Sequence, residues 1–153
     1  MEFMDAAIEE ACKSVRNGDG GPFGAVVVKE GKIVGSGRNM VSSAKDPTSH
    51  AELNAIKDAC KNLGTHQLNG CQLYTSCYPC PMCMGAIVWS RVDAVFYAAT
   101  LEQAASQGFD SRHAYELVKE PKTDEKRKLE VLEMKNTMKP FQMWIESGNK
   151  AYY

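Results

Sequence analysis

The chain has little net charge of either sign, and it lacks a long apolar run. Its 18 Lys and Arg residues are balanced by 19 Asp and Glu, which leaves a formal net charge of -1 over 153 residues. Such a balance provides no general attraction to nucleic acid or to anionic lipid. No apolar run approaches the roughly 20 residues that span a bilayer. Met1 to Asp5 also lacks the basic-then-apolar order of a signal peptide. We therefore expect a cytoplasmic protein with neither a membrane nor a nucleic acid as its partner.

Internal repeats, low-complexity tracts and linkers are also absent, so residues 1–153 are expected to form a single domain. Six cysteines could form three disulfides, but Cys80 and Cys83 have the spacing of metal ligands. The chain is also long and apolar enough to fold without disulfide bonds. We expect the other cysteines to be buried free thiols; they are Cys12, Cys60, Cys71 and Cys77.

Hydrophobic periodicity predicts an α/β protein. The predicted helices cover residues 1–17, 50–63, 81–89, 101–106 and 140–147. The predicted strands cover residues 23–29, 32–37, 71–75, 94–98 and 129–134. Glu30 and Gly31 join the first two strands as a tight hairpin. Helices that alternate with strands favour a partly parallel sheet, here opened by that hairpin.

His50-Ala51-Glu52 and Pro79-Cys80-Pro81-Met82-Cys83 are the segments that indicate chemistry. His50, Cys80 and Cys83 supply three zinc ligands, whereas a structural zinc site takes four and is closed. Three ligands leave the fourth position to water, whose pKa zinc lowers to roughly 7. Cys80 and Cys83 lie three residues apart, so at a helix start both sulfurs project to one side. The helix N-terminus also favours the thiolate form.

Glu52 is the carboxylate beside this group, and it can move protons between water, a ring nitrogen and a departing amine. A second interpretation is local: Ser49 and Glu52 have the spacing of a capping box, with Ser49 as N-cap. Cys-x-x-Cys alone is a weak signal, and His-x-Glu alone is weaker. Together they form the pattern typical of zinc-dependent base deaminases.

At these residues the chain resembles the cytidine deaminase-like superfamily, in its purine and tRNA-adenosine branch. Further stretches resemble the small bacterial guanine deaminases, and together they cover nearly the whole chain. These stretches are Gly20 to Ala25, Asn39, Asp46-Pro47-Thr48, Thr75 to Ile87, Trp89-Ser90-Arg91, Phe96 to Ala99, Gly108-Phe109-Asp110 and Tyr153. The resemblance is weakest over residues 111–139. It implies a three-layer α/β/α fold, with a mixed five-stranded sheet opened by a β-hairpin and helices on both faces.

The resemblance also implies roles for individual residues. His50, Cys80 and Cys83 would hold one Zn2+ per subunit, with Glu52 as proton shuttle. The substrate would meet the Asn39 amide, the Ala51 backbone N–H, Phe23, Trp89 and Asp110. Tyr153 would complete the site of a partner subunit in a homodimer with exchanged C-terminal segments.

Plainer interpretations of these binding residues stay open. Phe23 and Trp89 could be core aromatics, and Asn39 could serve a turn at a strand end. An aromatic ring can stack on a base, and an amide offers a donor and an acceptor to a purine edge. Tyr153 could also dock within its own subunit.

One position departs from the guanine deaminase pattern. The resemblance implies a second acid directly after Gly108-Phe109-Asp110, and this chain has Ser111. A hydroxyl cannot make the charge-assisted bonds of a carboxylate, and Asp110 or Glu102 could take over that contact. The expected reaction is the zinc-dependent hydrolysis of guanine, a small-molecule nucleobase, to xanthine and ammonia. The alternatives are another aminated base or nucleoside (guanosine, cytosine, adenine or a triazine), a tRNA adenosine deaminase, or a zinc module without activity.

Overall fold

In the computed structural model, residues 2–127 and 129–148 are described. Seven α-helices are present in this part of the chain: α1 (Glu2–Arg16), α2 (Val41–Ala44), α3 (Ala51–Leu63), α4 (Pro81–Ser90), α5 (Leu101–Ser106), α6 (Arg112–Lys119) and α7 (Lys139–Glu146). The strands are β1 (Gly24–Lys29), β2 (Lys32–Arg38), β3 (Cys71–Cys77) and β4 (Ala94–Ala99). A short 3-10 turn, Pro121–Thr123, follows α6. No helix of the described residues is both long and apolar enough to cross a membrane.

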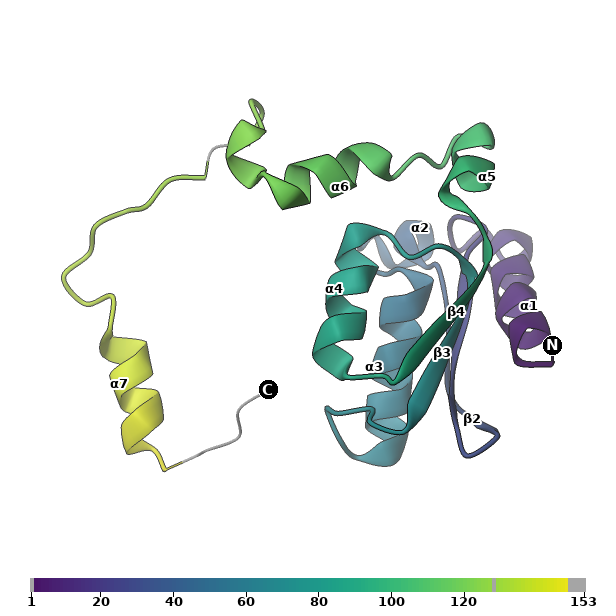
Figure 1. Cartoon of the computed structure of the whole chain (residues 1–153), viewed down its shortest axis with the longest axis horizontal. Coiled ribbons are helices and arrows are strands. Elements are labelled where there is room, and N and C mark those ends of the chain that lie inside the picture. The colour runs from purple at the N-terminus through teal and green to yellow at the C-terminus, as the bar shows by residue number, and fades with distance from the viewer. Residues whose placement is uncertain (1, 128, 149–153) are drawn as a thin grey trace.

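The four strands form one mixed sheet in the order β2-β1-β3-β4. β1 runs antiparallel to β2 and to β3, whereas β4 is parallel to β3. Helix α1 covers one face, and α3 and α4 cover the other (Figure 1). The expected three-layer α/β/α arrangement is therefore confirmed. Glu30 and Gly31 both have positive φ at the β1–β2 turn, as the predicted tight hairpin requires.

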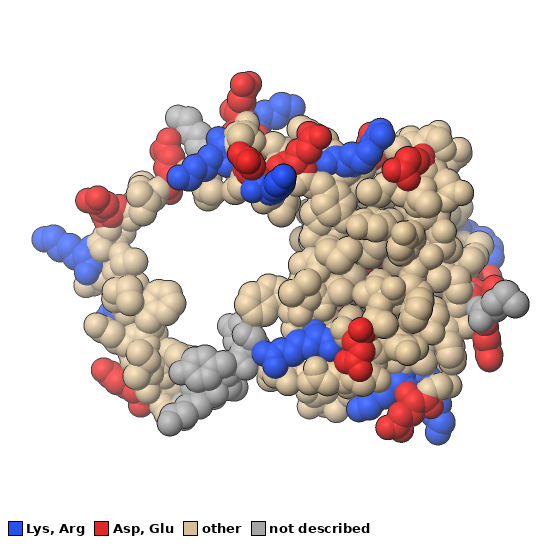
Figure 2. Space-filling model, in the orientation of Figure 1, with Lys and Arg blue, Asp and Glu red and all other residues tan. Residues whose placement is uncertain are grey.

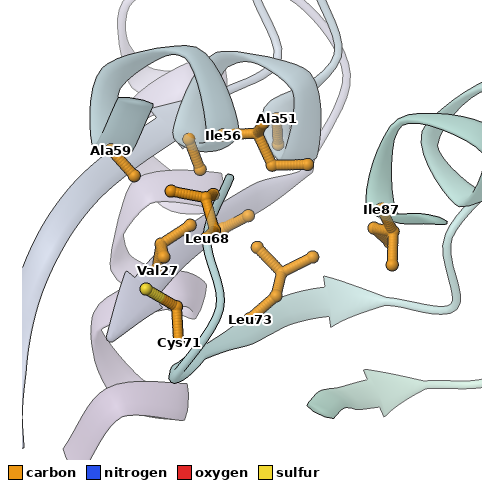
Figure 3. Packing of buried hydrophobic residues seen from close by; sticks show 10 residues of the cluster. Val27, Ala51, Ile56, Ala59, Leu68, Cys71, Leu73 and Ile87 are labelled. Atoms are coloured by element: carbon orange, nitrogen blue, oxygen red, sulfur yellow. The ribbon is translucent and has the colours of Figure 1, made fainter. Parts of the chain in front are cut away.

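The larger core lies between the sheet and α3. Val27 and Leu73 meet Ala51, Ile56 and Ala59 of that helix (Figure 3). Small side chains on α3 let it approach the sheet closely, and β2 matches them with glycine. A Cβ at Gly37 would overlap the Ala51 carbonyl and the Ala55 nitrogen. This close packing fixes the position of the first turns of α3 against the sheet. The candidate zinc ligand His50 lies at the N-terminal end of that helix.

The predicted fifth strand is wrong. Residues 129–134 belong to no strand, and within the described chain the sheet has four strands. Leu129, Val131, Leu132 and Met134 are exposed, Val131 by 87%. A segment of alternating polarity forms a strand only if it can pair with a sheet edge. The chain from residue 112 onward, here called the arm, begins with α6 and leads this segment away from β4 (Figure 1).

Two short helices were not predicted: α2, between β2 and α3, and α6, in the region of weakest resemblance. All six cysteines are free thiols. Cys71 and Cys77 are buried as expected, but Cys60 is half-buried and Cys12 is exposed. Cys12 follows the buried Ala11 and lies on the outer side of α1.

Candidate active site

Two helix N-termini meet at the candidate metal group. His50 is the N-cap residue of α3, and Cys80 is the N-cap residue of α4, with Pro81 at the first helical position. Cys83 lies one turn further along α4 and is buried. The ligand atoms of these three residues lie within 4.8 Å of one another. Among the described residues, His50, Cys80 and Cys83 are the one set of three or more His, Cys, Asp or Glu side chains placed closely enough to hold a metal ion.

The donor set fits zinc. His50 Nδ1 lies 3.4 Å from Cys80 Sγ and 3.6 Å from Cys83 Sγ. Tetrahedral zinc with ordinary Zn–S and Zn–N bonds would hold a sulfur and a nitrogen about 3.6 Å apart. Two sulfurs and one imidazole are the ligands that zinc prefers, and three protein ligands match a hydrolytic site.

The pKa values of the two cysteine thiols are shifted in opposite directions. The side-chain interaction with Cys83 lowers the pKa of Cys80 to about 4, and the same interaction raises the pKa of Cys83. The bond between Cys80 and the imidazole raises the pKa of His50. Cys80 is therefore a thiolate at neutral pH, and a thiolate is the form of cysteine that binds metals.

Glu52 lies in the first turn of α3 and is only 6% exposed. Its Oε2 accepts a hydrogen bond from Cys83 Sγ at 3.3 Å, and burial raises the pKa of the carboxyl. The predicted capping box with Ser49 is wrong. The N-cap is His50, and Ser49 Oγ instead accepts a hydrogen bond from Asn54 Nδ2 at 3.0 Å. Glu52 is thus directed to the metal group and not to the helix end.

A cavity of about 410 Å³ opens over this carboxylate. Its volume is in the range of small-molecule sites. The lining residues are Gly21, Phe23, Asn39, Val41, Ser42, His50, Glu52, Cys77, Tyr78, Cys80, Leu101, Ala104, Gly108, Phe109, Asp110 and Ser111. Of the residues predicted to bind substrate, Phe23, Asn39 and Asp110 are here, together with Ser111.

Asn39 presents a defined side of its amide. Oδ1 accepts the backbone N–H of Gly21 and that of Val41, each at 3.2 Å. Ser14, buried on α1, donates to the Asn39 carbonyl at 2.7 Å and so holds the backbone. With its oxygen engaged, Asn39 offers the cavity the NH2 donor of its side chain.

Phe23 and Phe109 form one wall. Their rings meet edge to face with centroids 5.1 Å apart. Phe109 was not singled out as a site residue in the sequence. The glycine before it, Gly108, has a φ of +89° and ends the α5 turn, which brings the ring back over the cavity. The Gly108-Phe109 pair was the sequence signal that could have indicated this wall. The position of the Phe109 ring depends, however, on where α5 ends.

Asp110 is engaged by a neighbour. Arg112 Nε and Nη2 donate to its two carboxylate oxygens at 2.8 and 2.5 Å, and this pairing lowers the pKa of Asp110 to about 2. Ser111 is the N-cap residue of α6, without a side-chain capping bond. The cavity wall at this end therefore carries a paired carboxylate and a neutral hydroxyl.

Three predicted residues lie elsewhere. Ala51 is fully buried at the first position of α3, where helix N–H groups lack a partner inside the helix. Trp89 lies on α4, is 65% exposed and does not line the cavity. Tyr153 lies outside the described residues. Cys77, which was expected to be a buried free thiol, and Tyr78, which was not singled out in the sequence, both line the cavity.

Comparisons with known proteins agree with this geometry. Residues 1–99 match the model of the cytidine and deoxycytidylate deaminase zinc-binding region. The Bacillus subtilis guanine deaminase is 47% identical over 99% of this chain and 97% of its own, and its crystal structure superposes with a TM-score of 0.94. A guanine deaminase from Nitrosomonas europaea has a TM-score of 0.67 at 34% identity, over 72% of this chain and 64% of its own.

A tRNA-specific adenosine deaminase from Aquifex aeolicus is 45% identical, but over 63% of this chain and 64% of its own. The match to the Bacillus subtilis protein continues through the C-terminal third. The chain therefore belongs to the zinc-dependent cytidine and deoxycytidylate deaminase family, within the group that contains the Bacillus subtilis guanine deaminase.

Proposed function

We propose that this chain hydrolyses guanine to xanthine and ammonia. The observation that carries the proposal is the buried Glu52 carboxylate, which contacts the His50, Cys80 and Cys83 group at the base of a cavity of about 410 Å³. The near-full-length similarity to a guanine deaminase selects the base.

Zinc bound to His50, Cys80 and Cys83 would supply Lewis-acid activation of the attacking water at neutral pH. Glu52 accepts a proton from that water, and its raised pKa suits it to return the proton during the same turnover. Glu52 passes this first proton to a ring nitrogen as a C–O bond forms at the carbon that bears the amino group. It then takes the remaining water proton from the new hydroxyl group and delivers it to the amine. The C–N bond breaks and ammonia leaves.

The cavity supports recognition of a flat base. The Asn39 NH2 group donates to an acceptor on the purine edge, and the Ala51 N–H lies beside the reacting atoms. Phe23 and Phe109 cover the ring, since aromatic faces stack on bases. A protein of known structure that is 34% identical to this chain holds 2,6-diaminopurine, another aminated purine.

Ser111 and the paired Asp110 favour a second candidate, another small aminated base. An ammonia-release screen with zinc-loaded protein over guanine, guanosine, cytosine, adenine and ammeline tests both. We expect guanine to react fastest. Brisk turnover of another base, with none of guanine, would overturn the proposal and implicate Ser111.

We also propose a homodimer whose C-terminal segments cross between subunits. Val88, Trp89, Phe96 and Tyr97 expose apolar surface on α4 and β4. The part of the molecule that precedes α6, here called the body, carries its charged side chains mainly around the margin of the view in Figure 2. The arm exposes apolar side chains of its own along residues 129–145. A single copy leaves both surfaces in water, and exchange would bury them together.

Trp89 and Tyr153 would then act across the interface. We further propose that residues 1–153 act as one deaminase unit in the cytoplasm, where reducing conditions keep the ligand thiols free.

A further inference from the structure

The peptide that precedes the ligand Cys80 carries a buried carbonyl in a segment poor in donors. Pro79 is almost fully buried, and prolines at 79 and 81 remove the two backbone N–H groups that flank Cys80. A buried carbonyl needs a donor. On either side the backbone is held: the Tyr78 N–H donates to the Ala99 carbonyl at 2.9 Å, and the Met84 N–H donates to the Cys80 carbonyl at 2.8 Å.

The donor for the Pro79 carbonyl comes from far along the chain. Tyr115, on α6, donates its hydroxyl hydrogen to this oxygen. Its ring lies 6.2 Å from that of Tyr78, which in turn meets Tyr97 of β4 edge to face at 5.0 Å. Burial raises the pKa of Tyr115 to about 12, so the hydroxyl keeps its proton across the working range.

We infer that Tyr115 is a positioning residue for the zinc ligand Cys80. The peptide unit is planar, so holding the Pro79 carbonyl also holds the direction of the Cys80 N–H and the place of its Cα. The sulfur position follows from that Cα, and a thiolate held in place loses less freedom when it binds metal. Tyr115 stands at the root of the C-terminal arm, so the bond also fastens the arm to the metal loop.

The inference rests on the proposed zinc site but not on the identity of the substrate. Tyr115→Phe removes the hydroxyl and leaves the ring among its aromatic neighbours. Tyr74→Phe is the matched control, because that hydroxyl bonds the exposed Gln72 and lies on the α1 side of the sheet. Circular dichroism and gel filtration establish that both variants keep the fold and the oligomeric state.

The first measurement is the rate of zinc transfer from purified protein to a chromogenic chelator. Groups that hold a metal ligand in place contribute about 10- to 100-fold to metal affinity. We expect transfer from Tyr115→Phe to be at least about tenfold faster, with Tyr74→Phe unchanged. In cobalt-substituted protein, the thiolate-to-cobalt absorption should change in the first variant alone. With guanine, kcat should fall while KM stays within about twofold.

Zinc transfer and cobalt absorption equal to those of the unmodified protein would overturn the role of Tyr115. Faster zinc loss in a protein that does not turn over guanine would support the inference and reject the proposed substrate. Faster zinc loss in both Phe variants would overturn it too, because removal of any tyrosine hydroxyl would then suffice.

Discussion

Two local patterns compete for Glu52. Its spacing from Ser49 predicts a capping box, and its spacing from His50 predicts a catalytic acid. In the structure the carboxylate is buried and accepts a hydrogen bond from Cys83, while His50 takes the N-cap position. Burial of a carboxyl is unfavourable unless it is paired, and a capping acid has no need of it. The environment therefore separates the two interpretations, where the spacing could not.

Glu52→Gln should abolish proton transfer without removing a zinc ligand. General acid–base catalysis by a positioned side chain contributes typically 10²- to 10⁴-fold. We expect ammonia release to fall by about that factor while the zinc content stays at one ion per subunit. Rate assays and metal analysis on the same preparation check this. Glu102→Gln serves as control, since that acid does not line the cavity. Full activity in Glu52→Gln would remove this residue from the mechanism.

The acid side of the pH profile should also report on Glu52. Burial raises its pKa above the ordinary value of 4.5, and only the carboxylate can accept a proton from water. As the pH falls through the raised pKa, the carboxyl becomes protonated and kcat/KM decreases. We expect the midpoint of this decrease above pH 4.5, measured with bound zinc monitored at each pH. A midpoint at or below that value, with zinc retained, would contradict the assignment.

The ligand set could be predicted from sequence because its spacing is local. Cys80 and Cys83 share one helical turn, and His50 precedes Glu52 by two residues. The cavity wall could not be predicted in the same way. Phe109 reaches the site through the turn after α5. The amide orientation of Asn39 depends on the backbone N–H groups of Gly21 and Val41, and Gly21 lies 18 residues earlier in the chain.

At the level of elements, β2 and α3 pack closely because Gly37 of β2 has no side chain to separate them. Gly37→Ala places a methyl group against the backbone of α3 near Ala51, so helix and strand must separate. Overpacking of this kind costs about 1–3 kcal/mol. We expect the free energy of unfolding in urea to fall by about that amount, and kcat to fall with it because His50 and Glu52 move with the helix.

Gly85→Ala is the matched control for this substitution. Gly85 lies within α4, and a methyl group there would meet no atom within 4 Å. Alanine in an exposed helix position should raise the free energy of unfolding by about 0.5–1 kcal/mol. Equal stability of the two variants would show that β2 and α3 can separate without loss.

Elements whose pattern is satisfied locally were predicted well. The helices predicted at residues 1–17, 50–63 and 81–89 are observed as α1, α3 and α4, and each begins and ends within one residue of the predicted bounds. The strand predicted at 129–134 failed because a strand depends on a partner edge, which no local pattern supplies. Helix α6 was missed because its place depends on Tyr115, which contacts a loop 36 residues earlier.

At the scale of the whole molecule, the arm and the body each expose apolar side chains. From α6 onward the chain leads away from the sheet, and α7 lies apart from it (Figure 1). Exposed apolar side chains on the arm include Leu132, Phe141 and Ile145. A monomer would leave an unusually large apolar surface in water. Exchange between two copies accounts for both surfaces with one symmetric contact.

A mixing experiment decides whether the arm completes its own site or that of a partner. Glu52→Ala inactivates the body but keeps the arm, whereas Tyr153→Ala keeps the body and changes the arm. Random re-pairing of equal amounts makes half of the dimers mixed, and each mixed dimer has one complete site if arms cross. Activity should therefore recover to roughly a quarter of that of the unmodified protein. If each arm serves its own subunit, every site keeps a defect, and the mixture stays at the mean of the two variants.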